Sequence, residues 1–320
     1  MAEGSVTNIS AAIPSSYKPM FPENRLPVYA VFQLVLFTSI FIVGFFGNCI
    51  IIYGVMQQGK YRTTSNYFIA NLALSDLAVL VISLPVQLLQ ELASWPFGEI
   101  ACKVFYPLGD VFICVSLATL TIISADRYRA IVTPFKTRLS KRQAKYAVVL
   151  IWIFSFLVYG LPVSFLLKIV EDERVWFCYP FWPSVLAKRL HMAFTACLVT
   201  ISMLVIAYSY IHIVRSLWQV RIIYRASSKD SQNSIVRLEQ KRKLVKMLIT
   251  IVIVFAICIM PYVLLAISME FATLPRNEIV RIALVVVMSQ LYLNSALNPV
   301  ILCTMSKDYR KGLRPCGCWE

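Results

Sequence analysis

Long apolar stretches alternate with short polar segments along the whole chain. Each stretch is long enough to cross a hydrocarbon core of about 30 Å as a helix of about 20 residues. Charged residues gather between the stretches and at their ends, as expected where lipid excludes charge. Hydrophobic residues make up 59% of the chain and charged residues only 15%, which leaves too little polar surface for a water-soluble domain. The predicted spans are Val28–Met56, Asn66–Leu92, Lys103–Ile131, Ala144–Leu167, Ala187–Val220, Leu244–Met269 and Ile279–Cys303.

This pattern predicts an all-α membrane protein, a seven-transmembrane helix bundle over residues 28–303. An odd number of spans puts the two chain ends on opposite sides of the membrane. With the amino terminus outside, 22 of the 31 lysines and arginines lie on the cytoplasmic side and 9 on the other, which is the bias that favours this orientation. We therefore expect an extracellular tail over residues 1–27 and a cytoplasmic tail over residues 304–320.

The net charge of +15 follows from the same asymmetry. The basic residues are spread over three loops and the tail instead of forming one nucleic-acid-binding face, and the densest run is Lys241–Lys243. Attraction to anionic lipid headgroups, worth about 1 kcal/mol for each basic residue near the surface, explains this distribution together with docking of a cytoplasmic partner. Membrane lipids are therefore expected partners, and nucleic acid is not.

Both tails carry motifs for covalent modification. Asn8-Ile9-Ser10 is an N-glycosylation acceptor in the polar amino-terminal tail. The carboxyl-terminal stretch SKDYRKGLRPCGCWE is basic and amphipathic, so it predicts a short helix in the membrane interface, anchored by palmitoylation of Cys316 and Cys318. Unmodified cytosolic thiols remain the alternative at both positions.

Two cysteines on the extracellular side lie outside the apolar interior of the spans. Cys102 precedes the third span and Cys178 lies in the loop after the fourth. Both are on the oxidising side of the membrane, so a disulfide between them is chemically available. Such a bond would hold the loop across the top of the bundle, whereas free buried thiols are the alternative.

Asp76 lies in the middle of the second span, where an unpaired carboxylate is costly. Polar side chains of two other spans are available to pair with it. Hydroxyl and amide groups around a carboxylate make an oxygen-rich site of the kind that a hard cation such as sodium prefers. The alternative is a protonated Asp76 that is only hydrogen-bonded to its neighbours. The candidate neighbours are Ser116, Asn294, Ser295 and Asn298.

Four prolines fall within predicted spans, at Pro85, Pro162, Pro261 and Pro299. Proline removes a backbone hydrogen bond and bends a helix. These positions are candidate hinges for a conformational switch, and ordinary packing kinks explain each of them equally well.

One short motif per span, in order, identifies the kind of protein. The chain resembles a rhodopsin-type (class A) G-protein-coupled receptor over nearly its whole length. The motifs are Gly47-Asn48, LALSDL at 72–77, Cys102 with Asp126–Tyr128, Trp152, Tyr210, Phe255 with Cys258 and Pro261, and Asn298-Pro299.

The resemblance implies a plasma-membrane receptor with an extracellular ligand pocket, a Cys102–Cys178 bridge, a short eighth helix and exchange catalysis on a heterotrimeric G protein. It also implies sodium near Asp76 as an allosteric ion, with no other cofactor, and arrestin as a further partner. The residues expected to couple to the G protein are Asp126, Arg127, Tyr128 and Tyr210.

The chain departs from the family pattern at four positions. Ile259 stands where helix 6 usually carries tryptophan, and Leu302 replaces the tyrosine that usually follows Asn298-Pro299. Ser202 lies near the place of the usual helix 5 proline, and Lys241 stands where many members have a glutamate facing the helix 3 arginine. The equilibrium between inactive and active states is therefore expected to differ from that of typical members, toward either basal activity or weak signalling, and these residues do not determine which.

Three features favour a peptide ligand. Trp95–Gly98 and Thr119–Thr121 are similar to the corresponding segments of neuropeptide receptors. Val170–Pro183 is long and aromatic enough to form a hairpin in the second extracellular loop, under which an extended peptide can pass. Its acids Glu171, Asp172 and Glu173 form an acidic rim with Glu91 and Glu270, which suits a basic peptide. The expected pocket residues are Gln87, Glu91, Asp110, Glu270 and Tyr292.

Glu270 is the ligand contact that the sequence favours most. It lies two and a half turns beyond Pro261, at the extracellular lip of the sixth helix. Receptors for neuropeptide Y-like and RFamide-like peptides are similar in carrying an acid there, which receives an arginine near the amidated end of the peptide. A solvated loop acid without a partner is the alternative.

Other classes of protein fit the sequence less well than a peptide receptor. Biogenic-amine receptors place an aspartate where Gly109 stands, and Asp110 lies about 100° around the helix from that position. A non-signalling scavenger receptor would lack the intact Asp126–Tyr128 motif, and an opsin would carry a lysine at Tyr292. The spans hold too few ionisable residues for a transporter, and neither a nucleophile with a base nor a spaced histidine pair indicates an enzyme.

Overall fold

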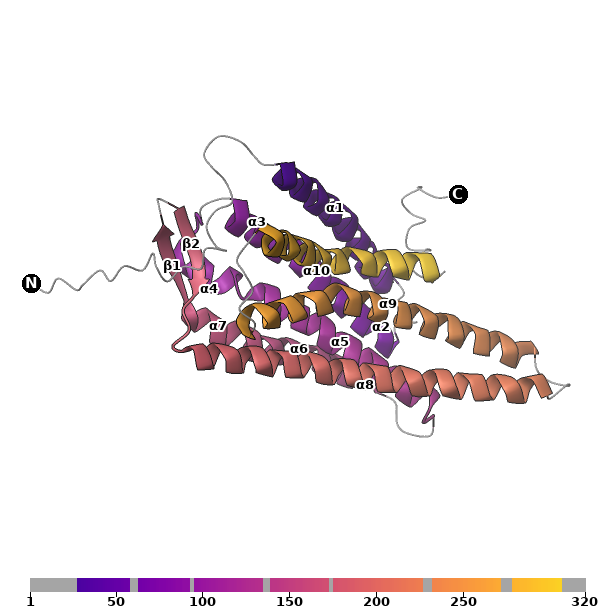
Figure 1. Cartoon of the computed structure of the whole chain (residues 1–320). Coiled ribbons are helices and arrows are strands. Elements are labelled where there is room, and N and C mark those ends of the chain that lie inside the picture. Colours follow the sequence, from indigo (N-terminus) through magenta and orange to yellow (C-terminus); the bar gives the residue numbers. More distant parts are fainter. Residues whose placement is uncertain are drawn as a thin grey trace, which may run out of the picture.

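The computed structural model describes residues 28–57, 63–92, 95–134, 139–172, 175–226, 232–271 and 278–306. In this part of the chain, seven helices are long and apolar enough to cross a membrane, and they pack as one bundle (Figure 1). The predicted seven-helix membrane fold is thus confirmed, and the chain is a multi-pass membrane protein. Asn8, Cys316, Cys318 and most of the predicted helix 8 lie outside the described residues.

The first four spans each agree with the prediction to within a few residues, and three of them are divided into shorter elements. The elements in chain order are α1 (Val28–Gln57), α2 (Thr64–Ala78), η4 (Val79–Ser83), α3 (Leu84–Leu92), α4 (Gly98–Phe105), α5 (Leu108–Ile131), α6 (Lys141–Ser155), η5 (Phe156–Gly160), α7 (Leu161–Leu166), β1 (Leu167–Asp172), β2 (Val175–Pro180), α8 (Val185–Ala226), α9 (Gln232–Phe271) and α10 (Glu278–Met305).

Prolines explain where the spans divide. The π-helical segments η4 and η5 lie just before Pro85 and Pro162, because a proline has no N–H to complete the regular ladder and a wider turn accommodates the missing bond. Pro107 separates α4 from α5 in the same way. Pro261 and Pro299, by contrast, lie inside the continuous helices α9 and α10.

Helices α8 and α9 are longer than their apolar spans. They contain 42 and 40 residues, so α8 is about 63 Å long at 1.5 Å per residue, roughly twice the hydrocarbon thickness. Both project beyond the other helices at one end of the bundle (Figure 1). The predicted limits Val220 and Leu244 mark the end of the apolar pattern, whereas the helices continue through Lys, Arg, Glu and Gln, which are good helix formers.

A β-hairpin covers the opposite end of the bundle, which we call the hairpin end (Figure 1). Strands β1 and β2 pair antiparallel, with Ile169 opposite Cys178. Phe177 and Cys178, on opposite faces of β2, are both buried. The hairpin predicted within Val170–Pro183 is therefore present, and it begins three residues earlier than predicted, at Leu167.

The main hydrophobic core lies in the other half of the bundle, which we call the Arg127 end. Buried side chains of α1, α2, α5, α8, α9 and α10 form one cluster there, including Phe68, Leu120, Ile213 and Phe255. A buried polar chain crosses the same region, because Trp152 Nε1 donates to Asn71 Oδ1 at 2.8 Å and Asn71 Nδ2 donates to Thr119 Oγ1 at 2.8 Å. Helices α6, α2 and α5 are thereby linked.

Candidate functional site

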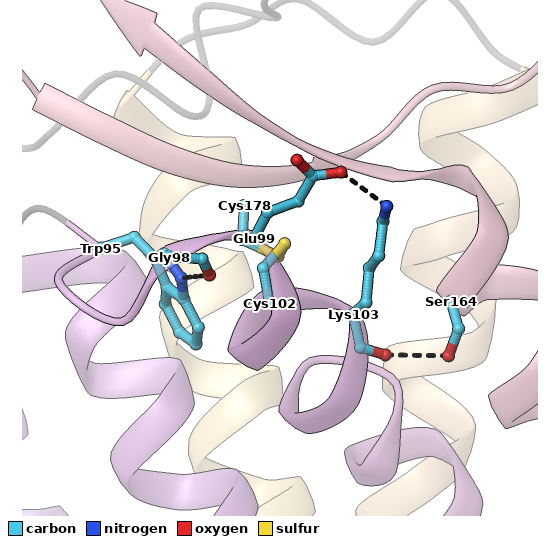
Figure 2. Close-up of a disulfide and its surroundings, with 7 residues drawn as sticks. All are labelled: Trp95, Gly98, Glu99, Cys102, Lys103, Ser164 and Cys178. Atoms are coloured by element: carbon cyan, nitrogen blue, oxygen red, sulfur yellow. Dashed lines mark hydrogen bonds and ion pairs between the residues drawn. A yellow bond between two sulfur atoms is a disulfide. The ribbon is translucent and has the colours of Figure 1, made fainter.

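The hairpin is fixed to the bundle by the predicted disulfide. Cys102 of α4 and Cys178 of β2 are bonded, with their Cα atoms 5.7 Å apart, and neither is exposed to solvent. Figure 2 shows β2 passing over α4 at this bond. The hairpin is therefore held to the first turns of the third span, as the resemblance implied.

Neighbouring hydrogen bonds hold the same corner (Figure 2). Trp95 Nε1 donates to the carbonyl of Gly98 at 2.8 Å, and the Trp95 N–H donates to the carbonyl of Trp176 at 2.7 Å. Gly98 has a φ of +73°, which a residue with a Cβ rarely adopts. On the other side, Ser164 Oγ donates to the carbonyl of Lys103 at 2.8 Å. The hairpin that covers the bundle, which we call the hairpin roof, is thus held in place by several hydrogen bonds around one disulfide bond.

Asp76 lies fully buried in the middle of the bundle. Asn298 Nδ2 donates to its Oδ2 at 2.8 Å, and the Ser295 side chain lies near the carboxylate. Ser116 shares a hydrogen bond of 2.9 Å with Ser75 and donates to the carbonyl of Phe112 at 3.1 Å. The structure therefore brings Asn298 and Ser295 directly to Asp76, with Ser116 bonded to the residue beside it.

Three oxygen acceptors in this region lack a hydrogen-bond partner among the described residues. They are Asp76 Oδ1, Asn294 Oδ1 and Asn298 Oδ1. A buried oxygen without a partner is costly, and carboxylate and amide oxygens are the ligands that hard cations take. The donor set therefore fits sodium. The described residues contain no cluster of three or more His, Cys, Asp or Glu side chains that could hold another metal ion.

Asp126 and Arg127 form an ion pair at the Arg127 end, with 2.8 Å between Nη2 and Oδ2. Ser65 Oγ donates to the same oxygen at 3.4 Å. Tyr128 faces away from this pair, because its ring packs 6.0 Å from that of Tyr208 and 6.1 Å from that of His212. In the predicted coupling motif, Asp126 and Arg127 therefore pair with each other within α5, whereas Tyr128 contacts aromatic residues of α8.

The residues that replace the family's switch side chains are part of the main core. Ile259 is 3% exposed and Leu302 is 2% exposed, and both pack in the cluster that contains Tyr210. Lys241 is exposed on α9. A cation therefore stands at the position where a glutamate would face Arg127, so this position offers Arg127 no partner on α9.

The predicted ligand residues occupy different environments at the hairpin end. Asp110 is exposed in the first turn of α5, and Gln87 is half-buried in α3. Tyr292 is buried in the wall of the bundle, where its OH donates to the carbonyl of Ser83 at 3.3 Å and its ring lies edge-on to Phe37. The remaining rim acids lie outside the described side chains, namely Glu91, Glu171, Asp172 and Glu173.

Glu270 is already paired within the protein. Its Oε2 lies 2.6 Å from Lys188 Nζ and its Oε1 lies 3.5 Å from Arg189 Nε. Its side chain is only 11% exposed. The sequence predicted a ligand arginine or solvent around Glu270, and the two cations of α8 were not predicted. Lys188 lies about five turns before Ile206, on the inward face of that helix.

Comparison with known proteins shows which family the chain matches. The family model described as "7 transmembrane receptor (rhodopsin family)" matches residues 47–302. The chain is 29% identical over 296 residues to galanin receptor 2a of Danio rerio, covering 91% of this chain and 79% of that receptor. It is 30% identical over 289 residues to the QRFP-like peptide receptor of Branchiostoma floridae, covering 87% of this chain and 75% of that receptor.

A third relative is considerably longer than this chain. The tachykinin-like peptides receptor 99D of Drosophila melanogaster is 31% identical over 302 residues, which are 89% of this chain and 56% of that receptor. This chain therefore spans little more than half of the Drosophila protein.

Proposed function

Since the chain belongs to the rhodopsin family of seven-transmembrane receptors, we propose that it binds an extracellular peptide and activates a heterotrimeric G protein at the plasma membrane. The receptor is not an enzyme, because its family acts by binding. In the proposed orientation the hairpin end is extracellular and the Arg127 end is cytoplasmic, which agrees with the excess of lysine and arginine near that end.

The hairpin roof is the observation that carries the peptide proposal. A two-stranded roof fixed at Cys102–Cys178 leaves exposed aromatic side chains at the bundle mouth, among them Phe97 and Trp176. An extended peptide can pass beneath such a hairpin and make backbone and side-chain contacts along it. The relatives are named as receptors for galanin, QRFP-like and tachykinin-like peptides, which supports the same ligand class.

Asp110 supports a second candidate, a receptor for a biogenic amine. Asp110 is an exposed residue in the first turn of α5, where a small cation entering from the hairpin end can reach it. Gly109 stands at the position where amine receptors carry their aspartate, and a Cβ there would lie 3.5 Å from Ser83 Oγ. Amines therefore belong in the same ligand screen as peptides.

We place G-protein coupling at the Arg127 end. The ion pair within α5 holds Arg127 against its own helix, and the projecting parts of α8 and α9 supply a surface beside it (Figure 1). Release of Arg127 from Asp126, accompanied by movement of α8 and α9, would open this surface to a partner. The intact pair also argues against a scavenger that binds ligand without signalling. Arrestin is proposed as a partner of the same end.

The test is a screen of peptides and amines on cells that express the full chain, with nucleotide exchange on several G proteins as the readout. We expect peptides to activate it and Arg127→Ala to abolish exchange while leaving agonist binding within about threefold, because the arginine lies far from the hairpin end. Activation by amines alone, lost in Asp110→Asn, would replace the peptide proposal with the second candidate. Full exchange activity in Arg127→Ala would refute the coupling site.

A further inference from the structure

The first turns of α8 and the last turn of α9 form a charged corner at the hairpin end. Lys188 and Arg189 of α8 pair with Glu270 of α9. The Arg189 guanidinium also lies over the ring of Phe271, 5.4 Å from its centroid. We call Lys188, Arg189 and Glu270, with Phe271, the cationic corner.

The corner faces the space between the helices. Lys188 lies about five turns before the buried Ile206, and Glu270 lies about three turns after the buried Ile259. Both side chains are therefore on the inward stripes of their helices. Lys188 nevertheless keeps 38% of its side-chain surface exposed, so it borders open space and not packed core. A ligand that enters the bundle at the hairpin end and passes along α8 would contact this corner before it reaches the deeper residues of that helix.

The charges in the corner do not balance. Two cations share one carboxylate, and the cations are 38% and 47% exposed whereas the carboxylate is 11% exposed. Both oxygens of Glu270 already have cationic partners. An incoming cation would have to displace Lys188 and Arg189, whereas an incoming anion meets an excess positive charge that is already in place.

Arg189 has donors to spare. It approaches Glu270 through Nε, and its two Nη groups have no hydrogen-bond acceptor among the described residues. Two parallel N–H groups match the two oxygens of a carboxylate. Glu270 and the ring of Phe271 fix the guanidinium from two sides, so little ordering is needed when a carboxylate binds.

We propose that the cationic corner recognises a carboxylate of the ligand, with Lys188 and Arg189 as the contacts and Glu270 as the residue that positions them. The inference rests on the proposed function, because it requires a ligand that enters at the hairpin end. It replaces a ligand arginine at Glu270 with a ligand acid beside it. For a peptide, the group is a free carboxyl terminus or an acidic side chain.

The first test needs no ligand. Purified full-length receptor is melted as wild type, Lys188→Met, Glu270→Gln and the double variant, because methionine keeps the apolar stem of lysine without its charge. We expect the two single changes to be non-additive, since either one removes the same ion pair. Additive shifts in melting temperature would show that the corner is not formed and would overturn the proposal.

The second test uses agonists from the screen, each synthesised with its carboxyl groups free and, one by one, as amides. One amide form should be at least about tenfold weaker on the wild type. In Arg189→Met and Lys188→Met the acid should fall to the potency of that amide, while the amide itself is unchanged. Glu270→Gln should preserve or increase the preference for the acid, because glutamine keeps an oxygen that can hold the two cations in position and removes the charge that neutralises them.

Lys168→Met supplies the matched control. Lys168 is another exposed cation at the hairpin end, on β1, and its ammonium lies over the ring of Phe181. Its removal should leave the ratio of acid to amide potency unchanged, which separates the corner from the general positive charge of this face. A similar loss of preference in Lys168→Met would overturn the assignment to the corner.

The opposite result has a distinct signature. If Glu270→Gln selectively weakens an arginine-containing peptide and not its citrulline analogue, and no amide form differs from the acid, Glu270 binds a ligand cation and the proposal is wrong. If only non-peptide molecules activate the wild type, the proposed peptide ligand is wrong. The same comparison of acid and amide forms of those molecules then still decides what the corner recognises.

Discussion

The two halves of α8 are held in the bundle in different ways. At the Arg127 end, α8 packs Ile206, Tyr210, Ile213 and Leu217 into one apolar cluster with the neighbouring helices. At the hairpin end, no residue of α8 from Val185 to Val205 is buried. There α8 makes ring contacts and ion pairs with Glu270, whereas the other helices and the hairpin still form buried clusters around Tyr292 and Cys178.

This difference suggests separate roles for the two halves of α8: the packed half stabilises the receptor, and the loosely packed half offers groups for ligand recognition. Close packing gives many small contacts that fail together, so the Arg127 end should move only between discrete arrangements. A few separate polar contacts leave space between them and are individually replaceable by ligand groups. Under the proposed function, we expect a ligand to displace the loosely packed half of α8, and the packed half to transmit the displacement.

Breaking the disulfide should have the largest effect on the hairpin end. The bond closes a loop of 76 residues, and loop-closure entropy at that length corresponds to about 4 kcal/mol. Cys102→Ser, Cys178→Ser and the double variant should therefore lose the same large amount of thermal stability and most ligand binding, because all three remove one bond.

Cys197→Ser is the control, since Cys197 is a free, exposed cysteine. It should melt within about 0.5 kcal/mol of the wild type. Peptide mapping without reduction identifies the bonded pair directly. Two freely alkylated thiols at Cys102 and Cys178 would contradict the structure.

Adding one methyl group to α1 tests the close packing of the other half. A Cβ on Gly47 would lie 2.7 Å from Cγ of Pro299, and the proline ring cannot rotate away. Gly47→Ala should destabilise the receptor by about 1–3 kcal/mol through overpacking. Gly54→Ala is on the same helix with nothing within 4 Å of its new Cβ, and it should stabilise by about 0.5–1 kcal/mol because alanine is the better helix former.

The two changes should thus shift the melting temperature of purified receptor in opposite directions. Destabilisation of equal size in both would mean that α1 tolerates no side chain at either position for a reason other than contact with Pro299. Stabilisation in both would show that α1 and α10 are not closely packed at Gly47.

The sequence predicts the packed half better than the hairpin end, for a physical reason. Each span is a long apolar run between polar segments, and such a run can be read from one segment alone. It was enough to locate seven spans and to place Asp76 near Asn298 and Ser295, because lipid forces a buried acid to find polar neighbours. It could not give the true lengths of α8 and α9, since their charged ends are outside the membrane pattern.

The hairpin end depends on pairings between distant segments. A disulfide is an exception, because two cysteines outside the spans leave few choices. No sequence motif marks Lys188 as the partner of Glu270, and from the sequence any lysine near the extracellular rim could form this ion pair equally well. The length and aromatic content of Val170–Pro183 predicted the hairpin, whereas the identity of the partner of Glu270 required the relative rotation of α8 and α9.

Removing the buried acid between the two halves should abolish a sodium effect. If sodium binds Asp76 with the unpaired oxygens of Asn294 and Asn298, then sodium at about ten times its Kd stabilises the wild type by about 1.4 kcal/mol relative to an equal concentration of choline. Asp76→Asn keeps the shape and loses the charge, so it should show no difference between the two salts in melting temperature or agonist affinity.

Asp110→Asn is the matched control, because it removes another carboxylate that lies within a predicted span. It should retain the sodium effect. Undiminished sodium sensitivity in Asp76→Asn would remove this site from consideration, and a wild type that is indifferent to sodium would favour the protonated, hydrogen-bonded Asp76.

Restoring the family's switch residues should produce the smallest change, and it should appear in signalling and not in affinity. Ile259 and Leu302 lie in the packed cluster with Tyr210, away from the hairpin end. In Leu302→Tyr, and in its combination with Ile259→Trp, a new hydroxyl near Tyr210 can gain a hydrogen bond in one state of the bundle. Such a bond is worth about 1 kcal/mol, or a roughly fivefold shift between two states.

The readout is basal and maximal nucleotide exchange, compared with agonist affinity measured in the absence of G protein. Val300→Tyr supplies the control, since Val300 is 41% exposed on the same helix and its new ring would face outward. It should change neither quantity. If Leu302→Tyr alters affinity alone, or if Val300→Tyr changes exchange equally, the packed half does not contain the switch. The division between a recognising half and a transmitting half would then be wrong.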